Sequence, residues 1–160
     1  MKVQFKLTQQ AKLLKKTHGI DVTPTKATKL DAGIDLRACI TEQVSVYPDE
    51  IVKIPTGVCI WLGDELYRRS GEMAFAGLYL PRSSSKGLVL ANTVGLLDSE
   101  YQHESFCKWR NTTDRLITIA PGERMAQLVV FPAFIVDLEQ VEEFEETTGR
   151  GAGDGSSGKL

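Results

Sequence analysis

The residues with the clearest chemical potential lie in the stretch VGLLDSEYQ, residues 94–102. An apolar run ends at Asp98, and the aromatic ring of Tyr101 follows three residues later. Gly95 permits close approach of a ligand, so the backbone here could read a flat heterocycle while Tyr101 covers an attached sugar. Asp98 would then be a general base that takes a proton from water. Asp98 and Ser99 are also typical of an ordinary hairpin turn, and that interpretation stays open.

A second polar cluster, LPRSSSKG over residues 80–87, follows another apolar run. Arg82 offers a fork of donors, and Ser83 and Ser84 offer hydroxyls and backbone amides, which together suit phosphate oxygens. Gln127, in the apolar stretch RMAQLVVF, could order a water molecule or contact phosphate. A solvated serine-rich turn and a structural amide are the alternative interpretations.

One carboxylate and one further arginine complete the set of candidate residues. Asp35 lies inside the strand-like run IDLRAC, where an acid is unfavourable. It would therefore either face a metal ion and its water molecules or be satisfied structurally as a buried turn residue. Arg150 lies in a glycine-rich tail, where neighbouring backbone N–H groups could help it to bind phosphate.

Charge, cysteine spacing and hydropathy limit the class of protein. The net charge of −2 supplies no field that attracts nucleic acid or an anionic membrane, so we expect neither as a partner. Cys39, Cys59 and Cys107 are an odd, dispersed set, which argues against a disulfide framework and a zinc site. No apolar run approaches the ~20 residues that cross a bilayer, and the N-terminal stretch lacks the apolar region of a signal peptide. We therefore expect a cytoplasmic protein, or a nuclear one in a eukaryote.

Short strand-like runs recur between turn residues and predict an all-β fold, a sandwich or jelly roll. Prolines fall at the edges of these runs, where they are tolerated. Two stretches, Gln9–Lys16 and Asp64–Arg69, are candidate helices. We expect residues 1–146 to form one domain, and the Gly/Ser-rich residues 147–160 to form an arm that is either disordered or closes over a ligand. The expected strands are Val3–Leu7, Ile34–Cys39, Val44–Val46, Ile51–Ile54, Val58–Leu62, Ala74–Leu80, Leu88–Ala91, Phe106–Trp109, Leu116–Ile119, Ala126–Phe131 and Ala133–Leu138.

The motifs DAGIDL, PRSS, NTVGLLDSEY, GERMAQ and RGAGDGSSG occur in the order found in the trimeric deoxyuridine triphosphatases (dUTPases). Each motif alone is weak, but five of them in order, spread over residues 30–158, make the chain resemble this family. The resemblance implies a jelly-roll subunit and a homotrimer whose sites lie between subunits. It also implies Mg²⁺-assisted hydrolysis of dUTP to dUMP and pyrophosphate.

The resemblance further implies roles for individual residues. Asp98 would be the general base, and Tyr101 would pack under the deoxyribose and exclude a 2′-hydroxyl. Asp35 would lie near the water shell of the Mg²⁺, and Arg150 would reach the γ-phosphate from the closing tail. Uracil would be read by Asn92 and by the backbone from Gly95 to Leu97. The phosphates would be held by Ser83, Ser84, Arg82 and Gln127.

The tail departs from the family pattern, which has two adjacent glycines followed by a Phe that stacks on uracil. Here the stretch is GAGDGSSG, Asp154 stands near the aromatic position, and no aromatic residue follows Phe144. A lost stacking ring would cost roughly one or two tenfold steps in binding or rate. Two alternatives to a dUTPase stay open. A dCTP deaminase would use a carboxylate near the base, with Glu104 as the nearest candidate, and a nucleotide-sensing module would regulate a partner protein.

Overall fold

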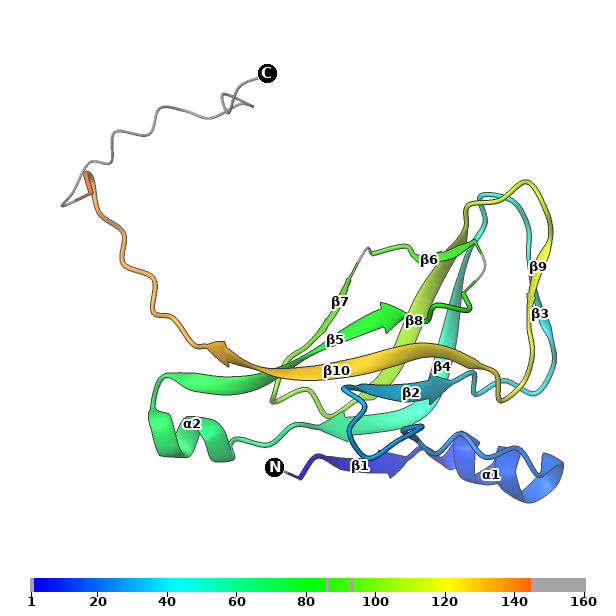
Figure 1. Ribbon diagram of the computed structural model, residues 1–160, viewed down its shortest axis with the longest axis horizontal. Helices are drawn as coiled ribbons and strands as arrows, with labels where there is room; N and C mark the ends of the chain where they lie inside the picture. Colours follow the sequence, from blue (N-terminus) through cyan, green and yellow to red (C-terminus); the bar gives the residue numbers. More distant parts are fainter. Residues whose placement is uncertain (1, 86, 93, 145–160) are drawn as a thin grey trace.

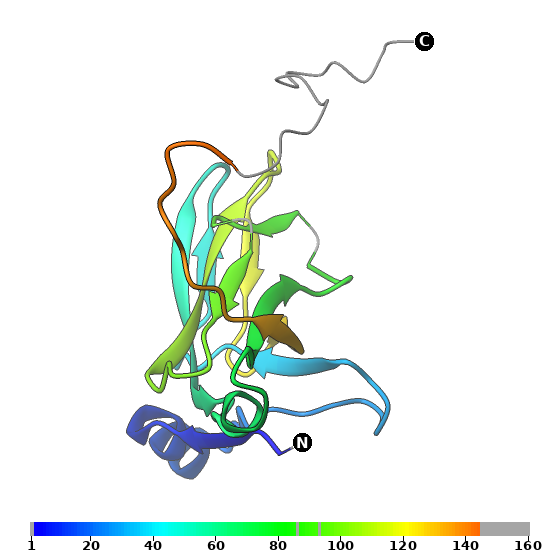
Figure 2. The same ribbon diagram turned by 90° about the vertical axis from the view of Figure 1, so that its left-hand side faces the viewer.

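The protein is built from three antiparallel sheets, which a computed structural model describes over residues 2–85, 87–92 and 94–144 (Figure 1). The first sheet has the strand order β1-β4-β8-β6, and the second has the order β2-β10-β5-β7. The third is the two-stranded ribbon β3-β9, which lies at one end of the molecule (Figures 1 and 2). The all-β prediction is therefore confirmed.

The elements have the following bounds. The strands of the first sheet are β1 (Gln4–Leu7), β4 (Ile51–Trp61), β6 (Leu88–Leu90) and β8 (Glu104–Asn111). Those of the second sheet are β2 (Gly33–Arg37), β5 (Met73–Pro81), β7 (Gly95–Leu97) and β10 (Arg124–Phe134). The ribbon consists of β3 (Val44–Val46) and β9 (Ile117–Ile119), and the helices are α1 (Gln9–His18) and α2 (Glu65–Ser70).

The main core lies between the two four-stranded sheets. Strand β8 alternates buried and exposed side chains along its length, because successive residues of a strand point to opposite faces. Its Trp109 is fully buried, and the indole N–H donates to Sδ of Met125 on β10, 3.4 Å away in the opposite sheet. Leu36 of β2 and Leu128 of β10 meet Trp109 in the same apolar cluster. Burial of these side chains fixes which face of the second sheet is left outside.

The two helices lie where the sequence predicts them, with ends shifted by one or two residues. Helix α1 begins after Thr8, whose hydroxyl accepts a hydrogen bond from the backbone N–H of Ala11, and ends at Gly19 with a φ of 70°. Its buried residues Ala11 and Leu14 form a small second core with Cys39. No helix in the described ranges is long and apolar enough to cross a membrane.

Two pairs of predicted strands are single long strands, so the predicted breaks at Pro55 and Pro132 are wrong. Pro55 lies inside β4, next to an irregularity where the pairing with β8 shifts register before Cys59. Pro132 lies inside β10 opposite Phe75 of β5, beyond Val129, where the pairing with β2 ends. A proline is tolerated there because β10 has a strand neighbour on one side only.

Candidate functional site

The second sheet positions most of the predicted site residues. Across β2 and β10, Asp35 pairs with Gln127, and across β10 and β5, Gln127 pairs with Leu80. The turn that begins at Arg82 follows directly at the end of β5. On the other side of β5, Gly95 of β7 pairs with Tyr79. Residues that lie far apart in the sequence are thus brought onto adjacent strands.

Gly95 lies against the side chain of Tyr79. A Cβ atom at position 95 would lie 3.0 Å from Cδ2 of Tyr79 and 3.6 Å from Nδ2 of Asn92, so a larger residue would crowd the Tyr79 ring. The Tyr79 hydroxyl lies 2.5 Å from Oγ of Ser105, and burial raises the pKa of the phenol to about 12 despite that hydrogen bond. A neutral, fixed ring therefore supports a stretch of backbone that a flat ligand can approach closely.

The turn after β7 exposes the side chain of Asp98 and holds the ring of Tyr101. The carbonyl of Asp98 accepts a hydrogen bond from the N–H of Tyr101 at 3.2 Å. The Tyr101 hydroxyl donates to the carbonyl of Glu104 at 3.1 Å, and the residue is 37% exposed. Asp98 itself is exposed. An exposed carboxylate in the same turn as a hydrogen-bonded aromatic residue is suited to take a proton from a water molecule.

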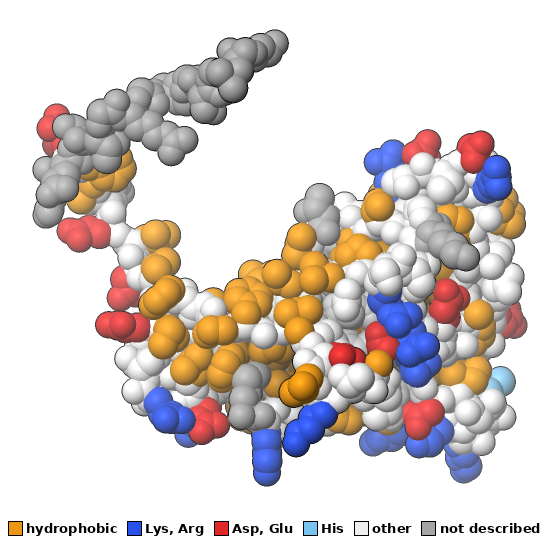
Figure 3. All heavy atoms as spheres, viewed as in Figure 1, with side chains coloured by type: hydrophobic (Ala, Val, Ile, Leu, Met, Phe, Trp, Pro, Cys, Tyr) orange, Lys and Arg blue, Asp and Glu red, His pale blue; other side chains and the backbone are white. Residues whose placement is uncertain are grey.

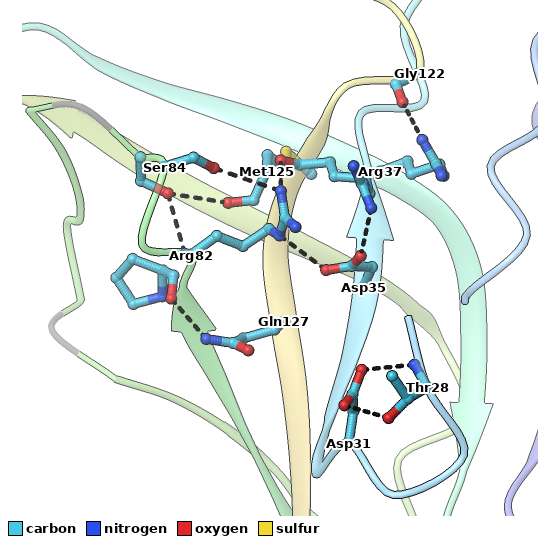
Figure 4. Close-up of polar contacts among 12 residues, drawn as sticks. Thr28, Asp31, Asp35, Arg37, Arg82, Ser84, Gly122, Met125 and Gln127 are labelled. Carbon is cyan, nitrogen blue, oxygen red and sulfur yellow. Dashed lines mark hydrogen bonds and ion pairs between the residues drawn. The ribbon is translucent and has the colours of Figure 1, made fainter. Parts of the chain in front are cut away.

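At the far side of the sheet, the carboxylate of Asp35 lies between two guanidinium groups (Figure 4). Its Oδ1 is 2.8 Å from Nε of Arg82, and its Oδ2 is 3.3 Å from Nη1 of Arg124. The Asp35 side chain is 12% exposed and that of Arg82 24%, so this ion pair is largely removed from water. Two interpretations of Asp35 were open, a carboxylate near a metal ion and a buried carboxylate with structural partners. The described contacts support the second, with two arginines as the partners instead of the groups of a turn.

A tight turn presents the serines beyond β5. The backbone N–H of Ser85 donates to the carbonyl of Arg82 at 2.9 Å, and the N–H of Arg82 donates to Oγ of Ser85 at 3.0 Å. Ser83 and Ser84 occupy the middle of this turn and are exposed. Nη1 of Arg82 lies 3.4 Å from Oγ of Ser84 (Figure 4). Hydroxyls, backbone amides and a guanidinium therefore gather at one sheet end, which is a suitable environment for phosphate oxygens.

Gln127 has a structural hydrogen bond as well as its place beside this turn. Its Nε2 donates to the carbonyl of Pro81 at 3.0 Å (Figure 4), which ties β10 to the start of the turn. The side-chain oxygen lies against Gly33 of β2, where any larger residue would collide with it. The alternative of a structural amide is therefore supported, and Gln127 remains close enough to the turn to act on the same ligand.

The described residues do not form a preassembled metal site. No group of three or more His, Cys, Asp and Glu side chains in the described ranges could hold a metal ion. Asp35, the carboxylate proposed near a metal, has each of its oxygens paired with an arginine. Direct coordination of Mg²⁺ by Asp35 does not fit this arrangement, because two guanidinium groups already neutralise the carboxylate.

The outer face of the second sheet is apolar over a continuous row. Leu96 of β7 pairs with Leu78 of β5, which in turn pairs with Val129 of β10. Leu96 is 60% exposed at the β7 end of this row. Hydrophobic atoms gather over β5, β7 and β10 in the space-filling view (Figure 3). An apolar surface of this kind marks an interaction site in a protein of ordinary composition.

Comparisons with known proteins agree with this geometry. A family model described as dUTPase matches residues 21–158. The chain belongs to the dUTPase family. It is 42% identical over 139 residues to the deoxyuridine 5′-triphosphate nucleotidohydrolase of Acinetobacter baumannii strain ATCC 17978, a match that covers 85% of this chain and 87% of that protein.

Solved dUTPase structures share the fold. The dUTPase of Staphylococcus bacteriophage 80alpha with dUPNHPP is 27% identical, has a TM-score of 0.75, and the match covers 99% of each chain. A mutant dUTPase from phage phi11 of S. aureus has a TM-score of 0.70 at 23% identity, covering 91% of this chain and all of that one. The phi11 structure reveals how a structural Mg(II) ion is coordinated in that protein. The jelly-roll-like subunit expected from the resemblance is therefore confirmed.

The structure groups the predicted dUTPase residues into two separate sets. The first set lies around the turn after β5 and consists of Arg82, Ser83, Ser84, Gln127 and Asp35. The second lies along β7 and the turn after it and consists of Asn92, Gly95, Leu97, Asp98 and Tyr101. Arg150, like the rest of the tail, lies outside the described residues.

Three contacts of the candidate site were not predicted from the sequence. Arg124 is the second partner of Asp35, and Tyr79 supports Gly95. Glu104, the candidate base of a dCTP deaminase, accepts a hydrogen bond from the backbone N–H of Gly57 at 2.8 Å. This bond ties Glu104 to β4 and argues against a role in chemistry at the base. Arg124 opens β10 and is exposed, so its place in the sequence gave no signal for a partner.

Proposed function

We propose that this protein hydrolyses dUTP to dUMP and pyrophosphate. The observation that carries the proposal is the exposed carboxylate of Asp98, three residues from the fixed ring of Tyr101, in a chain of the dUTPase family. The curated relative from A. baumannii is named for this reaction, and it shares most of its length with this chain.

In the proposed mechanism, Asp98 accepts a proton from a water molecule as that water attacks the α-phosphorus. A new bond forms between the water oxygen and phosphorus, and the bond to the α,β-bridging oxygen breaks to release pyrophosphate. Positioning and electrostatic stabilisation supply most of the rate in such phosphoryl transfers. A positioned general base contributes ~10²–10⁴-fold, which sets the expected loss when Asp98 is neutralised.

Uracil and deoxyribose would be recognised along β7. Uracil presents acceptor, donor and acceptor groups in a row, which the backbone from Gly95 to Leu97 and the Asn92 side chain could match. Cytosine reverses the donor at its exocyclic group and would leave buried polar groups unpaired, which is a strong basis for rejection. Tyr101 would pack against the sugar and exclude a 2′-hydroxyl.

The triphosphate would bind at the turn after β5. Ser83 and Ser84 are exposed there, and Arg82 is aimed by Asp35. Gln127 would join them, and Arg150 would reach the γ-phosphate from the tail. The substrate would arrive as its Mg²⁺ complex, with phosphate oxygens and water as the main ligands of the ion, which is the usual way Mg²⁺ is bound with nucleotides. Asp35 would act on that complex through Arg82 and water.

We further propose a homotrimer whose sites lie between subunits. Leu97, the residue before Asp98, pairs with Gly77 of β5. Pro81 ends β5 four residues after Gly77, so the two positions are ~14 Å apart along the strand. The turn carrying Asp98 continues away from Pro81, so one chain alone does not place the base and the turn after β5 around one α-phosphorus. The apolar outer face of the same sheet supplies a surface for assembly.

The decisive experiment measures pyrophosphate release from dUTP, dCTP, dTTP and UTP, with Mg²⁺ and with EDTA. We expect turnover of dUTP only in Mg²⁺, and a loss of roughly 10²–10⁴-fold in kcat for Asp98→Asn. Glu100→Gln is the matched control, because Glu100 is an exposed acid in the same turn. Intact dUTP after incubation with the wild-type protein and Mg²⁺ would overturn the proposal, and so would equal losses in the two variants.

A further inference from the structure

Tyr101 and His103 form a ring pair at the edge of the proposed sugar site. Their ring centroids are 5.6 Å apart and the ring planes meet at 69°, an edge-to-face arrangement. Aromatic rings favour this geometry because the positive edge of one meets the negative face of the other. His103 is exposed and follows Tyr101 by two residues in the turn that leads into β8. It takes no part in the proposed proton transfer.

The remaining contacts of Tyr101 leave one degree of freedom unfixed. Its backbone N–H is bonded to the carbonyl of Asp98, and its hydroxyl is bonded to the carbonyl of Glu104. Rotation of the ring about the axis from Cβ to the hydroxyl oxygen moves neither end, so both hydrogen bonds keep their donor and acceptor atoms in place while the ring plane tilts. The edge-to-face contact with His103 does resist it, because rotation changes the angle between the two planes.

The backbone on which His103 lies is itself anchored. Glu104, the next residue, accepts the N–H of Gly57 on β4 at 2.8 Å through its carboxylate. The adjacent Ser105 is buried and bonded to the hydroxyl of Tyr79. The backbone of His103 is therefore anchored at the start of β8, which keeps its ring next to the ring of Tyr101.

We propose that His103 is a positioning residue that sets the plane of the Tyr101 ring against the deoxyribose and thereby sharpens rejection of a 2′-hydroxyl. This inference rests on the proposed function, in which the Tyr101 ring meets the sugar. A ring free to tilt would leave room for the extra oxygen of a ribonucleotide. The contact joins two rings and is linked to Asp98 only through the backbone N–H of Tyr101, so we expect it to act on substrate choice.

The test compares His103→Ala with His103→Phe, which restores an aromatic edge without the imidazole nitrogens. His18→Ala is the control, because His18 is the other histidine of the chain and lies exposed at the end of α1. Steady-state kcat and KM are measured for dUTP and for UTP by pyrophosphate release. For His103→Ala we expect the ratio of kcat/KM for dUTP over UTP to fall about two- to tenfold, the range of one aromatic pair. His103→Phe should restore the ratio to within about twofold of wild type by the same reasoning.

Thermal unfolding and size-exclusion elution of each variant show whether the fold and assembly are retained. A His103→Ala protein that folds and elutes like wild type but keeps the wild-type ratio would overturn the inference. Failure of His103→Phe to restore the ratio would also overturn it, because the role would then belong to the imidazole and not to a ring edge. Wild-type turnover of dUTP separates these results from a failure of the proposed function, since it is measured in the same assay.

Discussion

Asp35 holds the guanidinium of Arg82 through a short ion pair, 2.8 Å between Oδ1 and Nε, at the point where β5 gives way to the turn over residues 82–85. The same carboxylate pairs with Arg124 on β10, so it joins three segments of the chain. An arginine held in this way presents its remaining donors in one direction, which lowers the entropy lost when it binds an anion.

Replacing Asp35 with Asn should destabilise the protein and weaken substrate binding together. The guanidinium groups of Arg82 and Arg124 would then lie close together without the negative charge of the carboxylate that neutralises them. We expect a loss of ~1–3 kcal/mol in the free energy of unfolding, less than for a fully buried pair because Arg124 is half-exposed. Denaturant unfolding at fixed protein concentration measures the stability change, and KM for dUTP should rise.

Asp49→Asn is the control for that experiment. Asp49 pairs with Arg110 at the same 2.8 Å, but the two side chains are 79% and 51% exposed. Asn also suits the positive φ of 61° at this position. We expect a change below ~1 kcal/mol, as is usual for surface ion pairs. Equal destabilisation by the two variants would show that burial does not distinguish these ion pairs.

Leu96→Glu should prevent assembly of the trimer and abolish most of the turnover. Leu96 is 60% exposed in the single chain and lies in the apolar row with Leu78 and Val129. A charge buried there on assembly would be unpaired, which is costly. Sedimentation velocity measures the size of the particles, and pyrophosphate release measures their activity.

Ile51→Glu gives a matched comparison for Leu96→Glu. Ile51 is 57% exposed but lies on β4, in the other four-stranded sheet. We expect this variant to keep the wild-type size and turnover. A trimer that survives Leu96→Glu, or a wild-type protein that sediments as single chains, would contradict the proposed assembly.

The sequence predicted the elements whose patterns are local. Alternation of apolar and polar residues marks β8, and the candidate helix Gln9–Lys16 corresponds to α1, which continues two residues further to its C-cap at Gly19. Strand β7 was not predicted as a separate strand, because three residues with a glycine among them give no periodic signal. Pro55 and Pro132 look like strand breaks in the sequence because a proline lacks the backbone N–H that a central strand needs. Each is tolerated for a reason that only the assembled sheet shows: a register shift follows Pro55, and β10 has no β2 partner at Pro132.

The partners within the candidate site depend on contacts distant in sequence, which no short pattern reports. Asp35 and Arg124 are separated by 89 positions in the chain, yet β2 and β10 bring them together. The motif order singled out residues that the structure gathers around the turn after β5 and along β7, and their roles stay predictions. It did not predict that two arginines would neutralise Asp35, because the sequence of one strand does not show which side chains of the neighbouring strands lie next to it.

The three cysteines should differ sharply in their reaction with iodoacetamide. Burial raises the pKa of Cys39 to about 11 and that of Cys107 to about 12, so at pH 8 almost none of either thiol is the reactive thiolate. Cys59 is partly exposed on β4. Mass spectrometry of the native protein should find a single modified residue, Cys59, and none in Cys59→Ser. Alkylation of Cys39 or Cys107 at the rate of Cys59 would contradict this expectation.

Acid should remove a specific contribution of Asp31 to stability. Its carboxylate accepts hydrogen bonds from the hydroxyl and the backbone N–H of Thr28, at 2.6 and 2.8 Å, and these lower the pKa of Asp31 in the folded protein. Because the folded state binds the proton less readily than the unfolded chain, the contribution is present above the ordinary aspartate pKa of about 3.9 and is lost below it. The gap in Tm between wild type and Asp31→Asn should therefore be widest near pH 7 and shrink as the pH falls to 3.

Asp114→Asn provides the reference for this pH series. The Asp114 side chain is 93% exposed, and its nearest cation, on Arg115, is 3.8 Å away. Its removal should therefore leave a small gap in Tm with no systematic dependence on pH. A gap for Asp31→Asn that stays constant from pH 7 to 3 would mean that the Thr28 hydrogen bonds stabilise the protonated and ionised carboxyl equally, contrary to the lowered pKa.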